Sequence, residues 1–157
     1  MRFLSSLSAL ACVVSALAAT PAIRQPAEGT LISPGAAFDF DYGSIADYGT
    51  SSYNYTVWLL TSLPTSFAPS TDFASGHFFG RFAEPNYPGN PNPPNTPPAQ
   101  LIMPDFSKNP GGFGSGASAT NATCYLAVFE EYANGEGSIG YRISFTANQI
   151  VYNATSH

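Results

Sequence analysis

The chain has 157 residues, a formal net charge of −5 and only five Lys and Arg residues. So few cations cannot neutralise a run of phosphates, which excludes nucleic-acid binding and argues against docking on anionic lipid. The length suits one domain with a sizeable core, and an aromatic content of 14% supplies large side chains to fill it.

Residues 1–19 have the pattern of a secretory signal peptide. Arg2 supplies one positive charge, an apolar run follows, and the small residues Ala16 and Ala18 frame a cleavage site. The apolar run is shorter than the roughly 20 residues that span a bilayer. We therefore expect a secreted, extracellular protein in which residues 20–157 form a single domain without a membrane anchor.

Cysteine usage and glycosylation motifs are consistent with that compartment. Cleavage removes Cys12, so no intramolecular disulfide is expected, and the remaining Cys124 is predicted to be a buried free thiol because it lies in an apolar stretch. Three Asn-x-Thr sequons predict N-linked glycans. Their acceptor residues are Asn54, Asn121 and Asn153.

The first half of the domain alternates short apolar runs with turn signals, which is typical of β-strands. Phe38, Phe40 and Tyr42 alternate with acidic residues and predict a strand with one buried face. A loop is predicted over 43–52. The predicted strands are 23–26 with 30–32 (broken at Glu28 and Gly29), 37–42, 53–60 and 77–82.

The strand over 53–60 is apolar on both faces, which suits the centre of a sheet. Trp58 is in phase with the sequon residue Asn54. A glycan on Asn54 within a regular strand predicts a wet face and an exposed Trp58. A buried Trp58 instead requires Asn54 to lie beyond the sheet edge or to stay unmodified. Of these two arrangements we favour the buried Trp58.

The segment 84–98 is rich in proline and cannot form an interior strand. It is predicted to be either a stiff crossover between two sheets or a presented binding loop with Asn86 and Tyr87 at its tip.

The second half predicts a strand over 100–103, a strong strand over 125–132 and a hairpin turn at 134–137. A strand over 140–148 is predicted to follow this turn and complete the hairpin, and residues 150–152 are predicted to extend that strand past a bulge. In the run 125–132, two arrangements are possible. Either Leu126 and Val128 face inward, or Tyr125, Ala127 and Phe129 do. About seven short strands predict an immunoglobulin- or fibronectin-like antiparallel β-sandwich, with a small barrel as the alternative.

The sequence lacks the residue clusters that catalysis or metal binding requires. His157 is the last residue, and His77 has no second histidine or cysteine near it. Glu130 and Glu131 are adjacent, so on a strand they point to opposite faces and cannot be the carboxylate pair of a glycosidase; pairing with Asp39 or Asp41 stays open. We expect a non-enzymatic protein without metal or cofactor.

Several segments, taken in order, are similar to a family of small secreted proteins. They are 23–30 with the turn 33–35, then 55–58, Phe79-Gly80, Pro93-Pro94, 101–107 and 126–132. In this order they resemble the necrosis-inducing secreted protein family of fungal effectors. The resemblance implies suppression of plant pattern-triggered immunity by binding receptor-associated immune kinases, with cell death on overexpression. It identifies no functional residues.

A second resemblance supports the alternative of a cell-wall or carbohydrate-binding module. The Pro-x-x-Gly-Thr stretch 26–30 and the Pro34-Gly35 turn are similar to the N-terminal domain of fungal wall-glucan assembly proteins. With either partner, a host protein or a wall glycan, we expect a monomer that acts by binding. The predicted binding residues are Tyr87 and Asn86 on the proline loop, followed by Tyr48.

Overall fold

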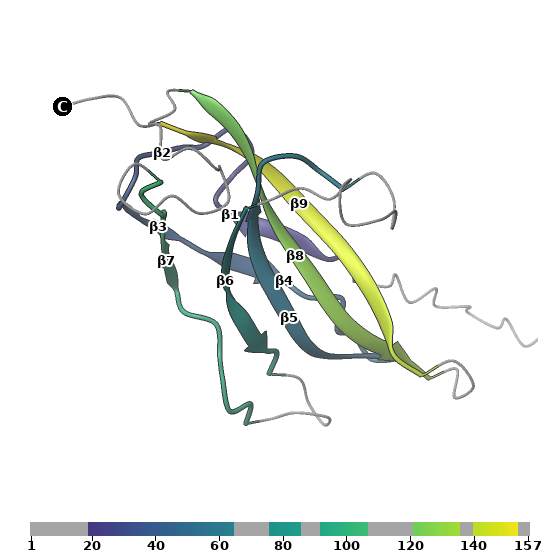
Figure 1. The fold of residues 1–157 in the computed structure, drawn as a ribbon. Helices are drawn as coiled ribbons and strands as arrows, with labels where there is room; N and C mark the ends of the chain where they lie inside the picture. Colours follow the sequence, from purple (N-terminus) through teal and green to yellow (C-terminus); the bar gives the residue numbers. More distant parts are fainter. Residues whose placement is uncertain (1–18, 65–75, 86–91, 107–120, 136–139, 154–157) are drawn as a thin grey trace, which may run out of the picture.

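The computed structural model describes residues 19–64, 76–85, 92–106, 121–135 and 140–153. These residues form nine β-strands and no helix, so the protein is all-β, as the sequence predicts (Figure 1). The strands are β1 (Ala22–Gln25), β2 (Leu31–Ile32), β3 (Ala37–Asp39), β4 (Asp41–Gly43), β5 (Thr50–Leu60), β6 (Gly76–Ala83), β7 (Gln100–Ile102), β8 (Ala122–Asn134) and β9 (Arg142–Tyr152).

The main element is a five-stranded sheet in the order β2-β9-β8-β5-β6, curled into a half-barrel. Its long strands β5, β8 and β9 are antiparallel neighbours, and β8 and β9 form the predicted terminal hairpin. The short strand β2 pairs in parallel with the end of β9, which makes the sheet mixed. Alternating aromatic, β-branched and small residues in these strands suit a pleated surface that is buried on one side.

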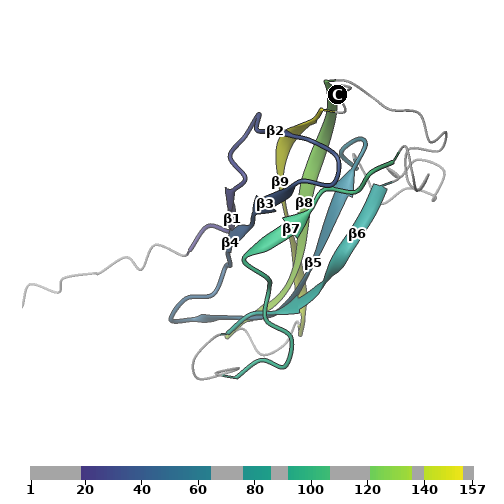
Figure 2. The ribbon, with the colours of Figure 1, turned by 90° about the vertical axis from the view of Figure 1, so that its left-hand side faces the viewer.

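Two short antiparallel ribbons, β1–β4 and β3–β7, lie across one side of this sheet (Figure 2). The strands β3 and β4 are consecutive pieces of one extended segment, so the ribbons are joined at Phe40. The alternation over 37–42 is confirmed, since Phe38, Phe40 and Tyr42 are buried and Asp39 and Asp41 are exposed.

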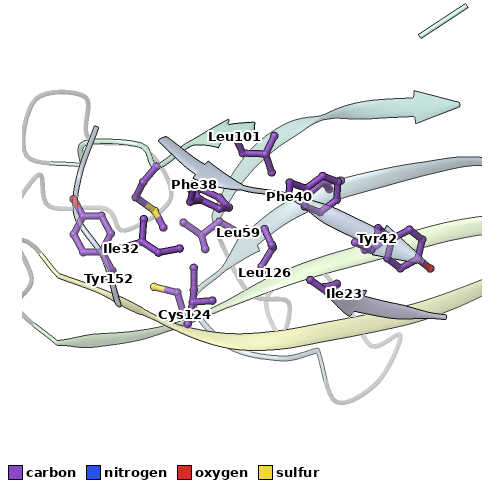
Figure 3. Close-up of a cluster of buried hydrophobic side chains, with 14 of the residues drawn as sticks. Ile23, Ile32, Phe38, Phe40, Tyr42, Leu59, Leu101, Cys124, Leu126 and Tyr152 are labelled. Atoms are coloured by element: carbon purple, nitrogen blue, oxygen red, sulfur yellow. The ribbon is translucent and has the colours of Figure 1, made fainter. Parts of the chain in front are cut away.

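The hydrophobic core fills the space between the ribbons and the sheet (Figure 3). Tyr55 lies at its centre, with ring centroids 4.9 Å from Tyr42 and 6.1 Å from Phe82. Cys124 is a fully buried free thiol, as predicted, and burial raises the pKa of this thiol to about 11. Packing therefore holds the described part of the chain together.

One strap crosses from the ribbons to the edge of the sheet. Between β1 and β2 the chain passes Asn148, whose side-chain amide donates hydrogen bonds to the carbonyls of Ile23 and Pro26 at 3.0 and 3.1 Å. The N–H of Gly29 donates to the carbonyl of Gln149 at 2.8 Å. The Gly29 bond satisfies a backbone carbonyl at the outer edge of β9, and the Asn148 amide satisfies two carbonyls of the crossing segment.

The prediction of a buried Trp58 is wrong. Tyr55, Val57 and Leu59 fill the core, so Trp58 lies half-buried on the opposite side of β5, in phase with Asn54. Its ring centroid is 4.7 Å from that of Phe78. Trp58, Phe78, Phe129, Ile143 and Phe145 form one exposed surface on the convex side of the sheet, which we call the aromatic face.

Other expectations need smaller corrections. The loop predicted over 43–52 is shorter, because β5 already begins at Thr50. The β8–β9 ladder runs in continuous register from residue 142 to 152, so the predicted bulge near residue 149 is absent from it. Of the two alternatives for β8, the one with Leu126 and Val128 inward is correct, since both are fully buried.

The described part of the proline segment, residues 84–85 and 92–98, contains no strand and connects β6 in the sheet to β7 in a ribbon. Asn95 follows the free edge of β6: its carbonyl accepts the N–H of Ala83 at 2.7 Å, and its side-chain amide donates to the carbonyl of Arg81. The segment is thus a crossover that covers a sheet edge.

Candidate functional site

The most prominent exposed aromatic side chain belongs to the loop between β4 and β5, residues 44–49, which we call the Tyr48 loop. Tyr48 has a relative exposure of 106%, so no neighbour covers it. Asp47 and Thr50 form an antiparallel bridge around Tyr48 and Gly49, which makes the tip a tight hairpin. The tip therefore presents one tyrosine side chain on a backbone turn of defined shape.

Hydrogen bonds within the tip fix its shape. Within the loop, the Asp47 carboxylate accepts the N–H of Gly49 at 2.9 Å; in the full chain it also accepts that of Ala19 at 3.2 Å, the last residue of the expected signal peptide. These bonds hold the pKa of Asp47 below its usual value, the bond from Gly49 being the larger cause. The carbonyl of Gly49 accepts the N–H of Gly135 at 3.3 Å, so the tip is also tied to the end of β8.

The base of the Tyr48 loop is held by a carboxylate inside the protein. Glu130 in β8 is fully buried. Its carboxylate accepts the Tyr42 hydroxyl at 2.6 Å, the N–H of Ile45 at 3.1 and 3.2 Å, and the Ser144 hydroxyl at 3.3 Å. In the described residues no Lys or Arg lies within ion-pair distance of it, so these donors take the place of a cation.

A second acid, Glu84, lies close enough to Glu130 to feel its charge. Glu84 is half-buried at the end of β6, and its desolvation raises the pKa of this carboxyl, with the Glu130 charge adding to the effect. A hydrogen bond from Ser44 and the charge of Arg24 oppose the shift. Ser44 belongs to the Tyr48 loop, so Glu84 also contacts the base of this loop.

Two core tyrosines respond to the same carboxylates. Burial raises the pKa of the Tyr42 phenol far above its usual value, and the hydrogen bond to Glu130 adds to the shift. Burial likewise raises the pKa of Tyr55, with smaller contributions from Glu84 and Glu130. Both phenols therefore stay neutral, and Tyr42 remains a hydrogen-bond donor to Glu130 across the ordinary pH range.

We expect the wild type to lose stability as the pH rises above 4.5, the ordinary pKa of glutamate, and we expect Glu84→Gln to lose less. Because the folded pKa is raised, the folded protein binds more protons than the unfolded chain in this window, so the charged side chain weakens the fold as pH increases. Thermal midpoints from pH 4 to 8 measure the effect. Glu28→Gln, on an exposed turn, is the control, and an E84Q profile parallel to that of the wild type would contradict the prediction.

The sequence-predicted site residues are not all gathered by the structure. Tyr48 lies at the loop tip, whereas Tyr87 and Asn86 fall outside the described residues. The glycosylation candidates occupy three places: Asn54 is half-buried on β5, while Asn121 precedes β8 and Asn153 follows β9. Asn121 is exposed and adopts a positive φ of 56°, a conformation that asparagine tolerates at turns.

Sequence analysis missed the role of Glu130. It correctly placed Glu130 and Glu131 on opposite faces: Glu131 forms an exposed ion pair with Arg81 at 2.7 Å. The available signal was the position of Glu130, which has the same phase along the strand as the inward residues Leu126 and Val128. An acid in phase with a buried face has to find donors inside the fold.

Within the described ranges, no three His, Cys, Asp or Glu side chains gather in a group that could hold a metal ion. No helix there is long and apolar enough to cross a membrane. The Tyr48 loop combines an exposed side chain with a backbone that hydrogen bonds hold at its tip and base. Comparison of the chain with known protein families, with curated proteins and with solved structures finds no match.

Proposed function

We propose that this protein is a secreted, non-enzymatic binding protein that contacts a protein partner through the Tyr48 loop. The observation that carries the proposal is the contrast between the fully exposed Tyr48 ring and the buried Glu130 carboxylate that anchors the base of the same loop. Tyrosine is enriched at interaction hot spots, and a loop already held in shape loses little entropy on binding.

The resemblance to fungal effectors supplies the class of partner. The proposed partner is a host protein of plant immune signalling, such as a receptor-associated kinase, and the proposed outcome is suppression of pattern-triggered immunity. An acidic surface with few cations is consistent with a protein partner and not with nucleic acid.

We also propose that the fold is related to the immunoglobulin-like sandwich. Two features support this. The chain passes from β1 in a ribbon to β2 at the edge of the main sheet, and β2 then runs parallel to the last strand. The segment of β3 and β4 pairs with β1 at one end and β7 at the other. An experimental structure in which these pieces form one continuous second sheet would establish the relation.

The functional test is the pattern-elicited oxidative burst in leaf cells that express the secreted chain. We expect the wild type to suppress the burst. Tyr48→Ala should abolish suppression and weaken capture of the partner by roughly tenfold or more. Leu31→Ala removes an exposed apolar side chain in β2, away from the Tyr48 loop, and is the control. An unchanged burst with the wild type, at confirmed expression, would overturn the proposal.

The aromatic face favours a second candidate, a module that binds wall polysaccharide. Aromatic rings on a sheet surface can stack on the apolar sides of sugar rings. Two pairs are available, Trp58 with Phe78 at 4.7 Å and Phe129 with Phe145 at 4.9 Å between centroids. Sedimentation with insoluble β-glucan tests this candidate, since Trp58→Ala should then lose binding and Tyr48→Ala should keep it.

A further inference from the structure

The aromatic face gathers five large apolar side chains on the outer side of the sheet. Phe78 in β6 has a relative exposure of 47%, and Phe145 and Ile143, both in β9, have relative exposures of 42% and 66%. The strand register joins them into rows: Phe78, Trp58, Ala127 and Ala147 in one, and Arg81, Thr56, Phe129 and Phe145 in the next. The Arg81–Glu131 ion pair borders the aromatic rings on the same face, and exposed apolar patches rimmed by polar residues mark sites that contact another group.

The acceptor of the first sequon lies on the same face. Asn54 and Thr56 point to the same side of β5 as Trp58. Asn54 pairs with Ala83 of β6 on one side and with Glu131 of β8 on the other. Asn54 is only half-buried, so its side-chain amide reaches solvent on the convex side of the sheet. Both side chains of the motif that direct glycosylation, Asn54 and Thr56, thus belong to the aromatic face.

We propose that the occupant of the aromatic face is the protein's own N-linked glycan on Asn54. In its attachment, the amide nitrogen of Asn54 bonds to the anomeric carbon of the first N-acetylglucosamine of a lipid-linked oligosaccharide. The nitrogen gives up a proton, and the lipid pyrophosphate departs as the leaving group. The proposal requires passage through a glycosylating secretory pathway and is independent of binding at the Tyr48 loop.

The spacing of the strands gives the glycan its contacts. Diagonal neighbours across an antiparallel pair lie roughly 7–8 Å apart, which places Phe129 within reach of the first sugar. Trp58 is four residues from Asn54 on the same strand, or about 13 Å, which is the reach of further sugars. The apolar sides of these sugar rings pack on the aromatic rings, while their hydroxyl groups face water.

The other sequons provide the matched comparison. Asn121 is exposed and directly precedes β8, and Asn153 directly follows β9, so both lie at the end of the hairpin where β8 begins and β9 finishes. Asn54 instead stands beside Glu131 near the other end of β8. A glycan on Asn121 is therefore of the same chemistry but is attached far from Phe129 and Phe145.

The test uses the full chain secreted from a eukaryotic host. Trp58 is the only tryptophan, so quenching of its fluorescence by acrylamide reports directly on the aromatic face. We expect Asn54→Gln to lose one endoglycosidase-sensitive step in gel mobility and to show roughly a twofold rise in the Trp58 quenching constant. Asn121→Gln should lose a step of the same size with the quenching constant unchanged.

A second pair of variants keeps the test independent of the asparagine. Thr56→Ser preserves the sequon and should match the wild type, whereas Thr56→Val destroys it and should behave as N54Q. Wild-type and N54Q proteins of equal mobility would overturn the proposal, because Asn54 is then unmodified. Equal quenching in N54Q and N121Q would overturn it as well, as would shielding of Trp58 that disappears on dilution, which indicates a second copy as the occupant.

Discussion

Replacing Glu130 by alanine is expected to destabilise the protein by about 3 kcal/mol and to loosen the Tyr48 loop. The substitution removes the acceptor of the Tyr42 hydroxyl and of the Ile45 N–H, which contact the fully buried carboxylate at 2.6 and 3.1 Å. Each buried donor left without a partner costs about 1–3 kcal/mol. Chemical denaturation followed by circular dichroism measures the loss.

The neighbouring residue is the control for this prediction. Glu131→Ala removes the next acid in the same strand, but that side chain is on the outer face in an exposed ion pair with Arg81. Such pairs contribute about 0–1 kcal/mol, so E131A should remain close to the wild type. Equal stabilities of E130A and E131A would show that Glu130 does not anchor the loop. In E130A, the amide of Gly49 should exchange faster, because the loop base is no longer held.

Leu126→Ala is expected to cost roughly 3 kcal/mol, through lost burial and the cavity left behind. Leu126 is fully buried in the core, with a relative exposure of 0%. It lies in β8 between Leu59 of β5 and Asn148 of β9. Neighbours in two long ladders cannot shift easily to fill the space. Urea denaturation gives the change in midpoint at constant slope.

The same substitution at an exposed leucine isolates the effect of burial. Leu31 in β2 has a relative exposure of 61% and pairs only at the sheet edge. Leu31→Ala is expected to change the free energy of unfolding by no more than about 0.5 kcal/mol. If L126A and L31A were equally stable, the core described between the ribbons and the sheet would be wrong.

Local patterns were enough to predict the strands. The alternation of Phe38, Phe40 and Tyr42 with acidic residues, for example, allows only one face of that strand to be buried. They were not enough for Trp58, because β5 is apolar on both faces and the choice of face depends on what covers it. The aromatic residues of β4 and β6 fill the inner side with Tyr55 and leave Trp58 outside. Neighbours from distant parts of the chain made that choice.

The candidate site was predicted only at its surface. Tyr48 is recognisable as an aromatic residue in a loop, but the anchoring of that loop depends on a contact between Ile45 and Glu130, 85 residues apart. A single sequence does not show which donors meet a buried acid. The parallel pairing of β2 with β9 was missed for the same reason, since both strands were expected but not their adjacency.

The order of the strands along the chain determines when the neighbours of Asn54 are synthesised. Asn54 lies on the interior strand β5, and its partner Glu131 in β8 follows 77 residues later in the chain (131 − 54). At ~5–20 residues per second, the ribosome needs roughly 4–15 s to produce that partner. During this interval β5 can pair with β6 but has no neighbour on its β8 side, so under our proposal Asn54 is modified while Glu131 is still absent. The proposed glycan on Asn54 is thus added before the five-stranded sheet is complete.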